Sequence, residues 1–139
     1  PILSVASFYP LWAGVATEAE AASTVAQLPR LEYDFGLATC EPGARTSAFQ
    51  WDYPNGWAPL HFIAVHGLLR YGYRAEAERI ARKYIHAIDR TFAETGTLWE
   101  KYNVTDGTLN VTDEYQMPPM LGWTAGVYVD FTTLLAPNG

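Results

Sequence analysis

The sequence predicts an all-α fold, with the helices arranged as part of a two-layer helical toroid that is incomplete in this chain. The segment from Trp57 to Tyr71 is apolar almost throughout, whereas the segment from Tyr73 to Thr95 carries its apolar residues on one side only. Stretches rich in Gly, Pro and polar residues connect the helical segments. The inner helices of a toroid are apolar all round and the outer helices are amphipathic, so this alternation indicates two layers.

The first quarter of the chain predicts one extended segment and one helix. Residues up to Phe8 form an apolar run that we expect to be extended and to end at Pro10. Thr17-Glu18-Ala19-Glu20 has the spacing of a capping box, with Thr17 as the N-cap. The Ala-rich run that follows predicts a helix to Leu28.

The middle of the chain predicts a long loop and two helices. Residues 33–56 are rich in Gly, Pro and polar side chains, and long loops of this kind are usually functional. Residues 57–71 predict a buried helix that stops at Gly72, and residues 73–95 predict an amphipathic helix that stops at Gly96.

The last part of the chain predicts a second long loop, over residues 97–121, and a final apolar helix over residues 122–135. Four helices cannot close a ring, so we expect further helices to come from outside this sequence. The apolar residues of 60–69 and 127–135 need a partner in that case, which is either a second copy or the missing helices.

Composition excludes several classes of function. The net charge is −6 and the pI is about 4.9, which argues against nucleic-acid binding because that requires a basic face. The longest apolar runs fall short of the roughly 18 residues that span a bilayer, so we expect a soluble segment whose compartment stays open. Cys40 is the only cysteine and cannot form an internal disulfide.

Residues 50–59 (Gln-Trp-Asp-Tyr-Pro-Asn-Gly-Trp-Ala-Pro) have the composition of a sugar-binding segment. Indole rings stack on the C–H faces of a sugar, and Asp, Asn and Gln hydrogen-bond its hydroxyls. The alternative is structural: Trp51 and Trp57 are core residues and Asp52 is the N-cap of the helix that follows. Composition alone does not decide between them.

The segment 50–59 matches, at every position, a signature of the trehalase family (Gln-Trp-Asp-x-Pro-x-Gly-Trp-[Pro/Ala/Ser]-Pro). Residues 98–103, 113–116 and 121–127 resemble three further segments of that family, in the same order. The similarity extends from about Gln50 to Leu135. It departs at Leu121, Ala125 and the run before Glu114, which leaves the exact substrate open.

The resemblance implies an (α/α)6 toroid that hydrolyses α,α-trehalose with inversion, with residues 1–139 as a C-terminal segment of the catalytic domain. It assigns the general base to Glu100 and a sugar contact to Glu114, with Asp113 as a competing candidate for that second role. The remaining substrate-binding candidates are those of the signature: Gln50, Trp51, Asp52, Asn55 and Trp57. The general acid of the family is an Asp in a more N-terminal segment, so we expect this chain alone to be inactive.

Three alternatives stay open from the residues themselves. Glu100 would otherwise form a surface ion pair with Lys101 or an Arg, as most Glu residues on loops do. The substrate could be another α-glucoside or an α-mannoside, or the chain could bind sugar without catalysis. His61 and His66 are five residues apart, which misses the spacing of a helical ligand pair, so we expect no metal. Two carboxyl groups suffice for the chemistry, and no cofactor is expected.

Overall fold

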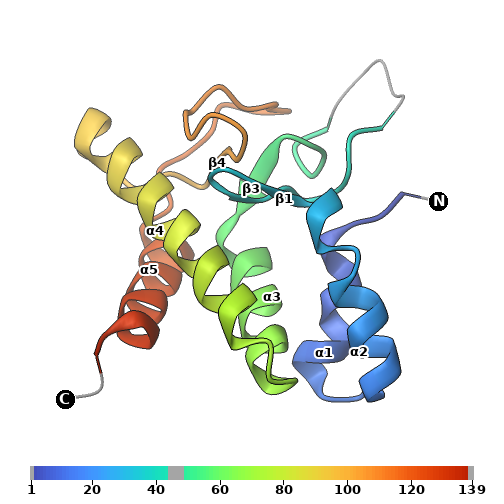
Figure 1. Cartoon of the computed structure of the whole chain (residues 1–139). Coiled ribbons are helices and arrows are strands. Elements are labelled where there is room, and N and C mark those ends of the chain that lie inside the picture. Colours follow the sequence, from blue (N-terminus) through green and yellow to red (C-terminus); the bar gives the residue numbers. More distant parts are fainter. Residues whose placement is uncertain (1, 44–48, 138–139) are drawn as a thin grey trace.

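Helix α3 (Ala58–Arg70) lies at the centre of the structure and packs against α1 (Tyr9–Ala13), α4 (Arg74–Thr95) and α5 (Leu121–Leu135). The structure is a computed structural model that describes residues 2–43 and 49–137. Figure 1 shows α1 and α2 on one side of α3, α4 and α5 on the other, and the short strands gathered at one end.

The three long helices predicted from the sequence are confirmed within one or two residues at each end. Helix α3 buries most of its length, and Pro59 occupies its first turn, where no backbone N–H is required. Helix α4 is amphipathic and ends at Gly96, which has a φ of 68°. Helix α5 is rich in β-branched residues but is held by packing, with Phe131 fully buried.

The N-terminal prediction of an extended segment is wrong. Val5–Phe8 forms a 3-10 turn (η1) that continues directly into α1. Pro10 does not end the run but lies in the first turn of α1, where its fixed φ and missing N–H fit the helix.

The capping box at Thr17 is confirmed. Thr17 Oγ1 accepts a hydrogen bond from the backbone N–H of Glu20 at 3.3 Å, and the Thr17 N–H donates to Glu20 Oε2 at 2.8 Å. Helix α2 (Glu18–Val25) ends earlier than expected, however, and Leu28–Arg30 form a separate 3-10 turn (η2).

The two predicted loops contain four short strands, so their assignment as irregular was wrong. Strands β1 (Glu32–Tyr33) and β2 (Gly36–Leu37) form an antiparallel hairpin. Strands β3 (Asn55–Trp57) and β4 (Lys101–Asn103) pair antiparallel, with Asn55 opposite Asn103 and Trp57 opposite Lys101. Strands of two or three residues are too short to show a periodic pattern.

A glycine permits the hairpin to approach helix α3. Gly36 has a φ of 130°, and a Cβ added there would lie 2.4 Å from Nε2 of His61 and 2.8 Å from the hydroxyl of Tyr102. The hairpin is therefore held against both α3 and β4, which fixes the end of the molecule where the strands meet.

The apolar residues of α3 are largely covered by the chain itself. Leu60, Ile63 and Leu68 are 9%, 8% and 0% exposed, so the expectation that this face needs an outside partner is wrong for these three residues. The turn η1 and helix α1 pack against α3. Val129 on α5 remains 61% exposed. Among the described residues, none of the helices combines the length and apolar character needed to cross a bilayer.

Candidate active site

The residues from Gln50 to Asn55 form a tight turn that leads into strand β3. The carboxylate of Asp52 closes this turn, because its Oδ2 accepts a hydrogen bond from the backbone N–H of Phe49 at 3.1 Å. The backbone carbonyl of Asp52 accepts from the N–H of Asn55 at 3.1 Å, and the Tyr53–Pro54 peptide bond is cis. The N-cap of α3 is Trp57, so the alternative that Asp52 caps this helix is wrong.

Three indole rings form an aromatic wall next to this turn. Trp51 and Trp57 are stacked, with ring centroids 3.8 Å apart and an angle of 9° between their planes. Trp123 from α5 meets Trp57 edge-on, with centroids 5.8 Å apart. Trp57 is 1% exposed whereas Trp51 is 43% exposed, so Trp57 is a core residue and Trp51 presents a ring to solvent.

Asn55 joins the signature turn to the segment before Asp113. Its Nδ2 donates to the carbonyls of Gln50 and Thr112 at 3.0 and 2.7 Å, and its Oδ1 accepts from the Thr112 N–H at 3.1 Å. The side chain is fully buried. Its hydrogen-bonding groups are thus used within the chain, and its predicted contact with a sugar stays a prediction.

Glu100 directly precedes strand β4, and only 7% of its surface is exposed. Oε2 accepts hydrogen bonds from the Tyr115 hydroxyl at 2.5 Å and from Lys101 Nζ at 3.2 Å. Oε1 accepts none from residues 2–43 or 49–137. Within these residues, the side-chain atoms that are inaccessible to solvent and lack a hydrogen-bond partner are Gln50 Oε1 and Trp123 Nε1. Glu100 Oε1 is not one of them, so this unpaired oxygen retains contact with solvent.

Glu100 forms an ion pair with Lys101, which the alternative from the sequence also expected, but this pair is buried rather than at the surface. The Lys101 side chain is completely buried, and its ammonium group also pairs with Oδ1 of Asp113. The Nζ atom lies 5.1 Å from the ring centroid of Trp57 and 4.9 Å from that of Tyr115. Two carboxylates and two aromatic faces therefore offset the desolvation of this cation.

Tyr115 is a stable hydrogen-bond donor to Glu100. Partial desolvation of the phenol, its hydrogen bond to Glu100 and the nearby negative charges raise the pKa of Tyr115 to about 12. The hydroxyl is therefore protonated throughout the neutral range and holds one oxygen of the carboxylate in place.

Glu114 lies at the edge of the signature turn. Its Oε2 accepts a hydrogen bond from the backbone N–H of Gln50 at 3.1 Å, and its side chain is exposed. The competing candidate, Asp113, instead uses its carboxylate on Lys101. The structure thus links Glu114 and Asn55 to Gln50 in the signature turn.

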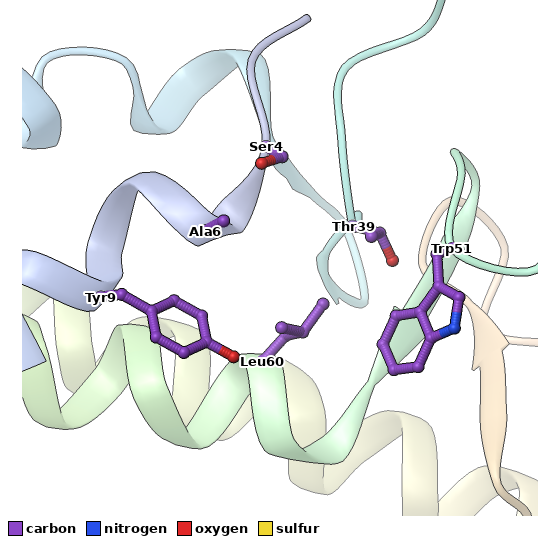
Figure 2. Close-up of a pocket in the computed structure, with 6 residues that line it drawn as sticks. All are labelled: Ser4, Ala6, Tyr9, Thr39, Trp51 and Leu60. Carbon is purple, nitrogen blue, oxygen red and sulfur yellow. The ribbon is translucent and has the colours of Figure 1, made fainter.

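A hollow of about 360 Å³ borders Trp51. Figure 2 shows the rings of Trp51 and Tyr9 at its two ends, with Leu60 from α3 between them. Ser4, Ala6 and Thr39 complete the lining, which does not include Glu100 or Glu114 among the described residues. The exposed indole of Trp51 therefore borders a cavity.

The sequence matches the family profile for trehalases over residues 2–136. The chain belongs to the trehalase family. It is 42% identical over 113 residues to a probable trehalase from Saccharomyces cerevisiae, which covers 76% of this chain and 14% of the yeast protein. It is 37% identical over 139 residues to a periplasmic trehalase from Xanthomonas oryzae, which covers 99% of this chain and 24% of that protein.

Solved structures support the trehalase fold. A neutral trehalase from Saccharomyces cerevisiae superposes with a TM-score of 0.83 at 34% identity, covering 97% of this chain and 24% of that one. A mannosylglycerate hydrolase from Thermus thermophilus superposes with a TM-score of 0.69 at 21% identity, covering 95% and 30%. The predicted fold class, part of a helical toroid, is confirmed, and the chain spans about a quarter of its trehalase relatives or less.

Sequence reasoning did not include Tyr115 in the candidate site, and it considered Lys101 only as a surface partner of Glu100. Each immediately follows a predicted site residue, Glu100 and Glu114, in segments that resemble trehalases. That adjacency was the available signal. A lysine next to a glutamate is ordinarily at the surface, and its burial here results from contacts with Trp57 and Asp113, which are distant in sequence.

Proposed function

We propose that this chain is the C-terminal part of a trehalase catalytic domain and supplies the general base for inverting hydrolysis of α,α-trehalose. Glu100 is the base. The general acid and the rest of the cleft come from parts of the toroid outside this sequence, so the chain alone has no activity. The similarity to trehalases supports the substrate class.

The observation that carries the proposal is the asymmetry of the Glu100 carboxylate. One oxygen is held by Tyr115 and Lys101, while the other accepts nothing from the described residues and reaches solvent. A general base must bind a water molecule through a free oxygen and must itself be held still. A purely structural ion pair has no need to leave one oxygen of a nearly buried carboxylate unpaired.

The proposed reaction uses this geometry. The water bound to Oε1 attacks the anomeric carbon of one glucose unit and gives a proton to Glu100. The bond between that carbon and the bridging oxygen breaks, and the oxygen receives a proton from the acid. An inverting hydrolase places its two carboxyl groups about 6.5–9.5 Å apart to accommodate the water. The attacked ring is released as β-glucose and the leaving ring as α-glucose.

The signature residues form the sugar-binding wall. Trp51 offers a solvent-facing indole for the apolar face of a glucose ring, and Trp57 supports it from behind. Gln50 and Asp52 lie in the same turn, and Glu114 lies at its edge as a further acceptor for sugar hydroxyls. Asn55 contributes by holding this turn against residue 112.

The test is trehalose hydrolysis by the full-length protein that contains this chain, with Glu100→Gln beside wild type. Loss of a general base lowers kcat by about a hundredfold to ten-thousandfold. Glu94→Gln is the matched control, because Glu94 forms an exposed ion pair with Arg90 at 3.3 Å on α4. Proton NMR of the first turnovers must show α- and β-glucose in equal amounts, since a retaining enzyme would release α-glucose alone.

Other results identify the alternatives. Cleavage of another α-glucoside or of an α-mannoside, without trehalose hydrolysis, would leave the fold and the base but overturn the substrate. Binding of trehalose without turnover of any glycoside by the full-length protein would indicate a non-catalytic sugar-binding role. Normal kcat in Glu100→Gln would move the base to Glu114 or Asp113.

A further inference from the structure

Lys101 is a single cation shared between two carboxylates. Its ammonium pairs with Glu100 Oε2 at 3.2 Å and with Asp113 Oδ1, while the side chain is completely buried. With one positive and two negative charges, the cluster keeps a net charge of −1. The negative charge of Asp113 therefore offsets part of the positive potential that Lys101 produces at Glu100.

Tyr115 acts on the same carboxylate in the opposite sense. Its hydroxyl donates to Glu100 Oε2 at 2.5 Å, and a hydrogen bond to a charged oxygen stabilises the ionised form. The Tyr115 ring also lies 4.9 Å from Lys101 Nζ, so the ring and the hydroxyl contact the two members of the ion pair separately. Replacing Tyr by Phe removes the donor and keeps the ring.

We propose that Asp113 and Tyr115 are positioning residues that set the strength of Glu100 as a base in opposite directions and direct its free oxygen toward the water. This inference rests on the proposed function. Tyr115 holds Oε2, so that Oε1 takes the proton. Asp113 competes for Lys101, so that the ammonium does not pair with Glu100 alone.

The charged and titratable groups around Glu100 come from two segments of the described chain. Lys101 lies on β4, and Asp113, Glu114 and Tyr115 lie on the segment before α5. Glu114 contacts the Gln50 backbone rather than Glu100. The wall from β3 and α5 presents the indoles of Trp57 and Trp123, which do not titrate. Asp113 and Tyr115 are therefore the groups whose removal changes the balance at Glu100.

The first measurement is the pH dependence of kcat for Tyr115→Phe in the full-length protein. Loss of a charge-assisted hydrogen bond should lower kcat about tenfold or more with little change in KM. The acidic limb should move to higher pH, because the ionised carboxylate has lost a donor. Tyr128→Phe is the matched control: its hydroxyl donates to Asp89 Oδ1 at 2.6 Å, away from Glu100, and its removal should leave both kcat and the limb unchanged.

The second variant is Asp113→Asn, which should move the acidic limb to lower pH by about half a unit or more and lower the plateau of kcat severalfold. A loss of structure would not move the acidic limbs of the Tyr115→Phe and Asp113→Asn variants in opposite directions. The inference alone would be overturned if the acidic limb of both variants stayed at the wild-type pH. In that case the wild-type protein would still hydrolyse trehalose and Glu100→Gln would be inactive. A wild-type protein that does not hydrolyse trehalose would instead overturn the proposed function.

Discussion

Nε2 of the His61 imidazole accepts a hydrogen bond from the backbone N–H of Leu37 at 2.8 Å. On the other side of the ring, Nδ1 lies 2.8 Å from the carbonyl oxygen of Trp57 and donates to it. The ring is therefore neutral, with its proton on Nδ1, and it joins the β1–β2 hairpin to the first turn of α3. Burial lowers the pKa of His61 to about 4, although the bond to Trp57 opposes this shift.

Acid should weaken the fold through His61. Because the folded pKa of about 4 lies below the ordinary value of 6.5, the unfolded chain binds the proton more readily in this window. Stability is complete above pH 6.5 and falls as the pH drops toward 4, by on the order of 3 kcal/mol. Denaturant titrations at pH 7 and 4.5 measure this loss. The loss of stability between pH 7 and pH 4.5 should be smaller in His61→Gln. It should be unchanged in His86→Gln, because His86 is exposed.

Gly56→Ala should destabilise the β3–β4 ladder. A Cβ at this position would lie 2.3 Å from Cγ1 of Val104 and 3.2 Å from Cε1 of His61. Overpacking of this kind costs about 1–3 kcal/mol. Gly43→Ala is the control, because its added Cβ would lie 3.8 Å from Ile2 Cδ1, an ordinary contact distance. Equal melting temperatures for the two variants would show that the ladder can relax around the methyl group.

Asn55→Ala should separate the signature turn from the segment around Thr112. It leaves the carbonyl and N–H groups of Thr112 without the buried amide that pairs with them. We expect a loss of about 2–4 kcal/mol in unfolding free energy. Hydrogen exchange should rise in peptides that cover residues 50–57 and 111–115. Asn110→Ala, an exposed position in the same segment, should change neither quantity.

Trp51→Ala should weaken sugar binding more than it slows the chemical step. The substitution removes the solvent-facing ring of the stacked pair, so KM for trehalose should rise about threefold to tenfold. Trp12→Ala is matched in exposure, since both indoles are 43% exposed, but Trp12 contacts Tyr9 on α1 rather than the signature. If both variants raise KM equally, the effect of Trp51 is not specific to the wall.

The helices could be predicted from the sequence because their signals are local. The spacing of apolar residues over 73–95 and the capping box at Thr17 are visible within a few residues. The 3-10 turn at Val5–Phe8 has no such pattern, and it forms where Val5 and Phe8 can both be buried. Helix α1 can follow because a proline in the first turn of a helix leaves no hydrogen bond unmade. The sequence alone does not distinguish such a proline from one that ends a segment.

The candidate site was accessible only through the family resemblance. Nothing local distinguishes Glu100 from a solvated glutamate, and its burial comes from Tyr115 and Lys101. Those contacts depend on the pairing of β3 with β4, two strands too short to predict. The role of Asn55 was equally hidden, because a buried amide that braces two loops and an exposed amide that binds sugar look the same in sequence.

The hydrogen bonds of Asn55 and Glu114 span 57 and 64 residues of sequence, and this separation bears on the order in which the site forms. During synthesis the Trp51–Trp57 pair emerges well before Lys101 and Tyr115, so the indoles lack their cation and their cover in that interval. Exposed aromatic surface on a growing chain invites aggregation. The carboxylate has both of its donors only after residue 115 has been translated, so the complete site requires nearly the whole described chain.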